Sequence, residues 1–161
     1  MSRCLNLTRT GEYALAALSR LALKDGGRKP VPVEALAGAQ RIPKAFLSKI
    51  IQHCVRAGLV RAKKGAAGGV SLTRDARDIS LLDIFEACEG SFQRDACVFY
   101  SERPCTGPEC EVYCPLRQEE QKLRERLGRT TLADMARALS VHPDAGAADV
   151  LNSGGIEWKR D

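Results

Sequence analysis

The chain has 161 residues, of which 44% are hydrophobic and 28% charged, a composition typical of a globular protein with room for about one domain. No apolar run approaches the roughly 20 residues that cross a bilayer, and the first stretch, MSRCLNLTRTGEY, lacks the apolar core of a secretory signal. These features exclude a membrane protein and indicate the cytoplasm, a reducing compartment, as the expected location.

The charge is divided unequally along the chain. Residues 1–74 carry 14 Lys and Arg against 3 Asp and Glu, a charge of +11, whereas residues 75–161 carry 11 against 17, a charge of −6. A concentrated basic half is typical of nucleic-acid binding, because clustered cations attract phosphates. The alternative is a basic surface that is merely solvated.

Two helices are predicted in the first 40 residues. Apolar residues recur at intervals of three and four over residues 7–24, which predicts an amphipathic helix with Thr8 or Thr10 as its N-cap. A short second helix is predicted over residues 33–39, followed by a tight turn over residues 40–42.

A third helix is predicted from Pro43, at its first position, to about Gly58. One face is apolar and is expected to join the core: Phe46, Leu47, Ile50, Ile51 and Cys54. The other face is small, polar or basic: Lys44, Ala45, Ser48, Lys49, Gln52 and Arg56. A short helix, a turn and such an amphipathic helix are typical of a helix-turn-helix, whose second helix enters the major groove of DNA. The alternative is a three-helix core without this function.

A basic β-hairpin is predicted next, because LVRAKK and VSLTR flank the turn sequence GAAGG. Its cations are Arg61, Lys63, Lys64 and Arg74. A hairpin directly after a recognition helix is typical of a wing that places cations against phosphates or in the minor groove. A nucleotide-binding loop is disfavoured, because no GK[ST] pattern follows the glycines.

Three more helices are predicted, over residues 78–89, 115–127 and 130–139. Ser80 and Asp83 form the capping-box pattern of the first of these. The last two share a thin apolar stripe: Leu116, Leu123, Leu127, Leu132, Met135 and Leu139. Because the stripe is narrow, we expect it to pack on a second copy of the chain or to lie across its own domain.

Four of the seven cysteines fall within eighteen residues, at Cys97, Cys105, Cys110 and Cys114. The intervening prolines and glycines favour turns that can bring four thiolates to one point. Soft thiolate ligands suit an iron–sulfur cluster or a structural zinc ion, whereas a pair of disulfides would need an oxidising compartment. Outside this cysteine loop, Cys54 and Cys88 are expected to pack as small hydrophobic residues, and Cys4 is a spare thiol or ligand.

Several segments together resemble the IscR/NsrR/CymR-like family of bacterial winged-helix transcription regulators. They are TRTGEYALAAL, IPKAFLSKIIQHCVRAGLVRAKKGAAGGVSLTRD, ISLLDIFEACEG and CPLRQEEQKLRERLGRTTLADM, and they cover nearly all of residues 5–139. The resemblance implies a homodimer joined through the long helix after the cysteine loop. It also implies a [2Fe–2S] or [4Fe–4S] cluster bound by three cysteines of that loop.

The cluster ligands implied by the resemblance do not all match. Cys97 and Cys114 correspond to the first and last cysteines of the family, and Cys105 or Cys110 corresponds to the middle one. Arg117 occupies the position of the histidine ligand found in some members. Glu12 matches an acidic position of the first helix that, in other members, reaches the cluster of the partner subunit. Ligation by four cysteines and ligation by three cysteines with Glu12 of the other chain therefore both remain open.

The sequence thus predicts a mainly α fold with a small β-hairpin: a winged helix-turn-helix domain plus a long dimerisation helix. The expected segments are a DNA-binding domain (5–90), a cluster-binding loop (91–114), a dimerisation helix with a terminal helix (115–139) and a tail (140–161). The residues expected to contact double-stranded DNA are Lys44, Ser48, Lys49, Gln52, Arg61, Lys63 and Lys64.

The expected function is that of a homodimeric repressor, not an enzyme, with no membrane partner. An iron–sulfur cluster that senses redox state, nitric oxide or iron and cluster status would control its DNA affinity. One alternative is the same regulator with a structural zinc or a thiol switch. An alternative of another class is a small iron–sulfur electron-transfer protein, which would leave the basic half and the helix-turn-helix unexplained.

Overall fold

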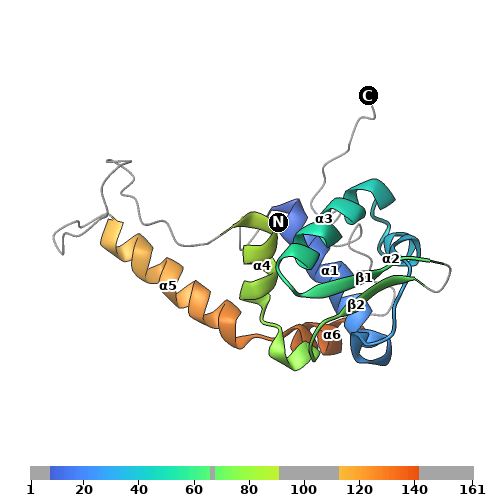
Figure 1. Cartoon of the computed structure of the whole chain (residues 1–161). Coiled ribbons are helices and arrows are strands. Elements are labelled where there is room, and N and C mark those ends of the chain that lie inside the picture. The colour runs from blue at the N-terminus through green and yellow to red at the C-terminus, as the bar shows by residue number, and fades with distance from the viewer. Residues whose placement is uncertain (1–7, 66–67, 91–112, 142–161) are drawn as a thin grey trace.

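A computed structural model describes residues 8–65, 68–90 and 113–141, and the side chains of the last segment from residue 118 onward. The fold is mainly helical with one two-stranded hairpin, as the sequence predicts (Figure 1). The side chains of the four loop cysteines, Cys4 and most of the expected tail lie outside the described residues.

The helix α1 (Arg9–Leu23) is the centre of the fold. It packs against α2 (Val33–Gln40), α3 (Lys44–Arg56), α4 (Leu81–Glu89) and α6 (Leu132–Ser140). Of the two predicted N-caps, Thr8 and Thr10, the structure has Thr8, whose hydroxyl accepts a hydrogen bond from the Gly11 amide. Ala14, Leu18 and Leu21 are fully buried, because α1 has neighbours on several sides.

The hairpin consists of β1 (Val60–Lys63) and β2 (Gly69–Leu72), which pair antiparallel with Val60 opposite Leu72. A third segment extends this small sheet. The Val31 amide donates to the Val70 carbonyl, and the Val70 amide donates to the Val31 carbonyl, both at 2.9 Å. The hairpin is therefore anchored to the connection between α1 and α2. This connection contains the 3-10 turn η1 (Asp25–Gly27), and Val31 lies after that turn.

The segments that enter α4 and α6 pair with each other. The Leu81 amide donates to the Thr130 carbonyl at 2.9 Å, and the Leu132 amide donates to the Ile79 carbonyl at 2.8 Å. The predicted capping box of Ser80 and Asp83 is present at the start of α4. This helix begins at Leu81 rather than at residue 78, because Ala76–Asp78 form a separate 3-10 turn, η2.

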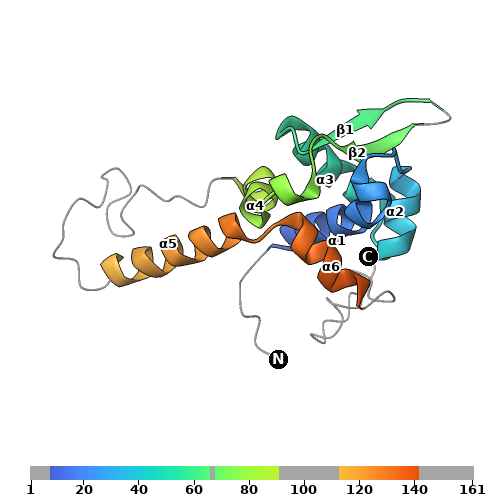
Figure 2. The same ribbon diagram turned by 90° about the horizontal axis from the view of Figure 1, so that it is seen from below.

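The apolar stripe of the last two helices is divided between two roles. Leu132 and Ala136 of α6 are 0% and 6% exposed and pack in the core beside α1, so α6 lies across its own domain. The hydrophobic core therefore extends beyond the 5–90 segment expected from the sequence. In contrast, α5 (Tyr113–Arg129) projects away from the body in both views (Figures 1 and 2). Of the described side chains of this helix, only Leu127, near its end, is buried.

One prediction about α3 needs correction. Phe46 is expected on the core face but is 36% exposed, and its ring packs edge-on against Tyr13 with the ring centroids 5.5 Å apart. The predicted end of the helix is confirmed: α3 ends at Arg56 with Ala57 as its C-cap, and Gly58, with a positive φ of 71°, follows the C-cap. The remaining predicted core residues, Leu47, Ile50, Ile51 and Cys54, are buried.

Among the described residues, no helix is both long and apolar enough to cross a membrane.

Candidate nucleic-acid interface

The turn between α2 and α3 fixes the direction of α3. Arg41 adopts a left-handed conformation (φ 52°), and the Ile42 amide then donates to the Ala37 carbonyl at 2.9 Å. Ile42 is 4% exposed, so its side chain anchors the turn in the core. Pro43 is the N-cap of α3, so the helix begins at Lys44, one residue later than predicted, and the Pro43 carbonyl accepts from the Leu47 amide. A short helix, a buried turn and an amphipathic helix thus form a helix-turn-helix.

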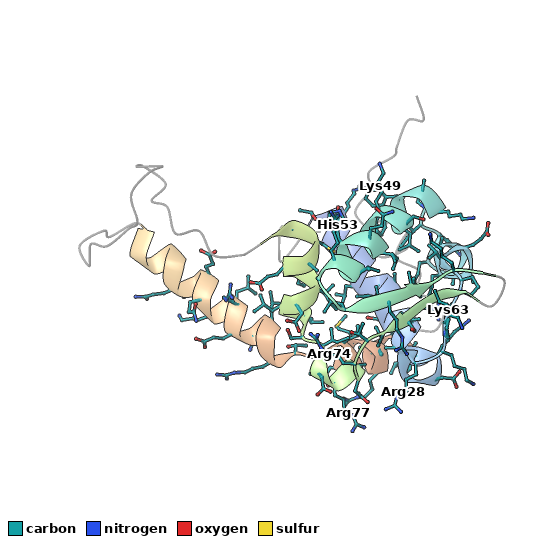
Figure 3. The ribbon with its side chains drawn as sticks, in the orientation of Figure 1. Arg28, Lys49, His53, Lys63, Arg74 and Arg77 are labelled. Carbon is teal, nitrogen blue, oxygen red and sulfur yellow. The ribbon has the colours of Figure 1, made fainter. Side chains whose placement is uncertain are left out.

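A continuous exposed stripe runs along α3, formed by Ala45, Lys49, Gln52 and Arg56. Their spacing of four, three and four residues places them on one side of the helix. Figure 3 shows Lys49 and His53 at the outer edge of the body on α3. Arg56 was not among the expected DNA contacts. Its position seven residues after Lys49, about two helical turns, places it on the same side of the helix and could have indicated it.

Lys44 and Ser48 lie beside this stripe and already have partners. The Lys44 ammonium is 3.1 Å from the Glu34 carboxylate, and the Ser48 hydroxyl donates to the Lys44 carbonyl at 2.8 Å. Both side chains of the ion pair are more than half exposed, and an exposed pair of this kind contributes only about 0–1 kcal/mol. A phosphate could therefore replace Glu34 as the partner of Lys44 at little cost.

The hairpin carries the other expected cations. Arg61, Lys63 and Lys64 are exposed, and the Arg61 Nε donates to the Ser71 hydroxyl at 3.0 Å. Neither Lys63 nor Lys64 forms an ion pair with another residue that the structure describes. Figure 3 places Lys63 on the hairpin. The arrangement of free cations on α3 and on the hairpin is that of a recognition helix with a wing.

Other cations are held in ion pairs in the lower part of the view, away from Lys49. Arg74 lies 3.2 Å from Asp83, and Arg28 lies 3.7 Å from Asp75 (Figure 3). Arg74, which the sequence places on an arm of the hairpin, therefore ties the end of the wing to the first turn of α4.

Gly69 provides a test of how the wing is positioned. It has a φ of 150°, and a Cβ there would lie 2.5 Å from the Val31 backbone. Gly69→Ala should therefore lower the free energy of unfolding by about 1–3 kcal/mol, because both the strained φ and the close backbone must be accommodated. Urea unfolding followed by circular dichroism measures this change.

Gly38→Ala is the matched control for this substitution. Gly38 lies in α2, and a Cβ added at this position would meet nothing within 4 Å. Alanine there should leave stability unchanged or raise it by up to about 1 kcal/mol, since alanine favours helix more than glycine. Equal effects at the two glycines would contradict the close contact between the wing and Val31.

Glu12 is the one expected cluster ligand whose side chain lies within the described residues. The amide and hydroxyl of Thr8 donate to the Glu89 carboxylate at 3.2 and 2.7 Å, so the start of α1 lies at the end of α4, where the chain enters the cysteine loop. Glu12 is in the first turn of α1, and its Oε2 is buried without a hydrogen-bond partner among the described residues. A buried carboxylate oxygen of this kind is stabilised by a cation or a donor.

The donor set of the cysteine loop fits a soft-metal group, since thiolates are the ligands that an iron–sulfur cluster or a zinc ion prefers. Within the part of the chain that the structure describes, no three His, Cys, Asp or Glu side chains cluster closely enough to hold a metal ion.

The helix-turn-helix with its buried turn, the exposed stripe with its cations on α3 and the basic wing define a winged-helix DNA-binding protein. The family model Rrf2, described as an iron-dependent transcriptional regulator, matches residues 7–138. The chain therefore belongs to the Rrf2 family of transcription regulators. This result confirms the predicted family and the winged-helix fold.

Named relatives and solved structures agree with this assignment. The HTH-type transcriptional regulator IscR of Photobacterium profundum is 28% identical over 152 residues, which cover 92% of this chain and 86% of that protein. The structure of CymR, the global cysteine regulator of B. subtilis, matches with a TM-score of 0.69 and 25% identity, covering 83% of this chain and 98% of that one. IscR of T. potens matches with a TM-score of 0.63 and 26% identity, covering 97% and 95%.

These homologues are transcription regulators and not enzymes, as the sequence predicts for this chain. Transcription regulation through DNA binding is therefore the function that family membership supports.

Proposed function

We propose that this protein is a homodimeric repressor whose DNA affinity is controlled by an iron–sulfur cluster in the cysteine loop. The observation that carries the proposal is the position of that loop. It directly follows α4, which packs against α3, and directly precedes α5, which projects from the body. A change in the loop can therefore act on the recognition helix and on the projecting helix together.

The DNA contacts follow from the exposed cations. Lys49 and Gln52 face base edges in the major groove, with Arg56 further along the same stripe. Lys63 and Lys64 of the wing contact phosphates or the minor groove. The flanking residues contact phosphates and orient the helix: Lys44, Ser48 and Arg61.

The dimer contact is assigned to α5. Its described side chains are mostly charged and exposed, and Leu123 is partly buried on its apolar side. A projecting helix of this kind can pack against the same helix of a second copy. The two recognition helices of such a dimer would lie about 34 Å apart, the separation of half-sites on DNA. The protein would act in the cytoplasm, where the operator DNA lies.

The C-terminal half of α5 is joined to α4 by an ion pair, and the segment after α5 pairs with the start of α4. The Arg124 guanidinium lies 2.8 Å from the Glu86 carboxylate, and both side chains are only 29% exposed. The backbone pairing of Leu81 with Thr130 adds a second link nearby. A shift of the loop would therefore reach α3 through the packing of α4 rather than through α5 alone.

The cofactor would be held by Cys97, Cys105, Cys110 and Cys114, or by three of them with Glu12 of the partner subunit. When bound, the group supplies a link between its ligands that oxidation, nitric oxide or iron loss can break. A thiol switch or a structural zinc at the same cysteines is a second candidate. The similarity to CymR, the global cysteine regulator of B. subtilis, supports this second candidate.

Lys64→Ala tests the DNA interface. Because this variant loses one phosphate contact, its affinity for mixed-sequence and operator DNA should fall alike, and the slope of log K against log salt should flatten by about 1 unit. Fluorescence anisotropy with a labelled mixed-sequence duplex, repeated over a range of salt concentrations, measures the slope.

Arg137→Ala is the charge-matched control. Arg137 lies on α6, and in Figure 1 this helix is at the opposite side of the body from α3. Removing this positive charge should leave the salt slope unchanged. An unchanged slope in Lys64→Ala would remove the wing lysine from the phosphate contacts, and equal flattening in both variants would indicate a general effect of net charge.

A further inference from the structure

Two free cysteines outside the cysteine loop meet between the recognition helix and α4. Cys54 lies on the core face of α3 and is fully buried, whereas Cys88 lies in the last turn of α4 and is partly buried. Cys88 packs against the core cluster that contains Cys54, where α3 contacts α4, and the two thiols lie within hydrogen-bonding reach of each other. They are 34 positions apart in the sequence, from which they are expected only to pack as small hydrophobic residues.

The two thiols of this pair are not equivalent. The Cys54 S–H donates to the Cys88 sulfur, which lowers the pKa of Cys88, whereas this hydrogen bond and burial raise the pKa of Cys54. The thiolate is the reactive form of cysteine. Cys88 is therefore the more nucleophilic and the more accessible thiol, and Cys54 is a protonated neighbour within reach of it.

We propose that Cys54 and Cys88 form an oxidisable dithiol site that responds to a two-electron oxidant such as hydrogen peroxide. The Cys88 thiolate attacks one peroxide oxygen, the O–O bond breaks, and a sulfenic acid and hydroxide form. The Cys54 sulfur then attacks the Cys88 sulfur, forming the disulfide, and its proton leaves with the departing hydroxide as water. In total, two thiols and one peroxide give one disulfide and two waters.

The disulfide would connect the recognition helix to α4 covalently. A disulfide holds its two sulfur atoms about 2.05 Å apart, which is much shorter than the contact distance of two thiols that are not bonded. Closing the bond therefore draws α3 and α4 together at Cys54, the last buried residue on the apolar face of α3. The exposed stripe on the other side of α3 moves with it, so oxidation should weaken DNA binding.

This site does not depend on the proposed cluster. Its two sulfurs come from α3 and α4, and neither belongs to the four cysteines of the loop. A full-length variant with all four loop cysteines changed to serine retains the pair. The dithiol site can therefore be tested even if the proposed cluster does not form.

Peptide mapping of the oxidised protein tests the bond directly. The full-length protein and the variant without loop cysteines are treated with hydrogen peroxide, blocked with an alkylating agent and digested with trypsin without reduction. Cys54 then lies in the peptide of residues 50–56 and Cys88 in the peptide of residues 78–94, with one cysteine in each. We expect a disulfide-linked mass of these two peptides in both proteins, which is lost after reduction. Its absence from both would overturn the proposal.

The DNA affinity of the variant without loop cysteines tests the consequence. Oxidation should weaken binding to a mixed-sequence duplex by at least about fivefold, and dithiothreitol should restore it. Adding Cys88→Ser should abolish this response, and the partial exposure of Cys88 makes this substitution milder than one at buried Cys54. A linked peptide pair without any change in affinity would overturn the role of the disulfide in DNA binding.

Discussion

Serine substitution at Cys97 or Cys114 should remove the visible absorption of the protein purified without oxygen. These two cysteines are ligands in each of the open ligand sets, and a serine hydroxyl is a poor ligand for the iron of a cluster. Of Cys105 and Cys110, loss of colour at only one would identify the other as the extra cysteine. The measurements are a visible spectrum and the iron, sulfide and zinc content per chain.

Two controls make this experiment decisive. Cys88→Ser should retain the colour, because Cys88 lies on α4 and is outside the proposed ligand set. Glu12→Gln should bleach or shift the spectrum only if ligation uses three cysteines with the partner's carboxylate, since an amide is a neutral and weaker ligand. A colourless wild-type protein with one zinc per chain would replace the cluster with structural zinc.

Leu132→Ala should lower the free energy of unfolding by about 2–5 kcal/mol, because it removes a fully buried leucine from the contact between α6 and the core. A loss of this size is a large part of the stability of a typical domain. Urea unfolding of the full chain measures it, with the DNA affinity of the folded fraction as a second readout.

Val141→Ala, next to the end of α6, is the matched control. Val141 is 72% exposed, and truncating it should change stability by less than about 0.5 kcal/mol. If Leu132→Ala had an equally small effect, α6 would not be part of the folded core, and the DNA-binding domain would end with α4.

The sequence predicted the helix-turn-helix and the wing well, because their signals are local. The apolar spacing of Leu47, Ile50 and Cys54 reports a helix face within a few residues, and the capping box of Ser80 and Asp83 spans only four positions. The prediction for Phe46 was wrong because this residue lies at the edge of the apolar face, where a ring on a neighbouring helix decides burial. Tyr13 supplies that ring.

The sequence by itself determined the class of the protein, the recognition helix and the cations on its polar face, since helical period, turn residues and charge can be read from neighbouring positions. Only the tertiary structure decided that Val31 extends the wing, that α6 completes the core and that Cys54 meets Cys88. Each of these contacts joins segments tens of residues apart. Their pairing depends on how whole helices pack around α1, and no local pattern records that packing.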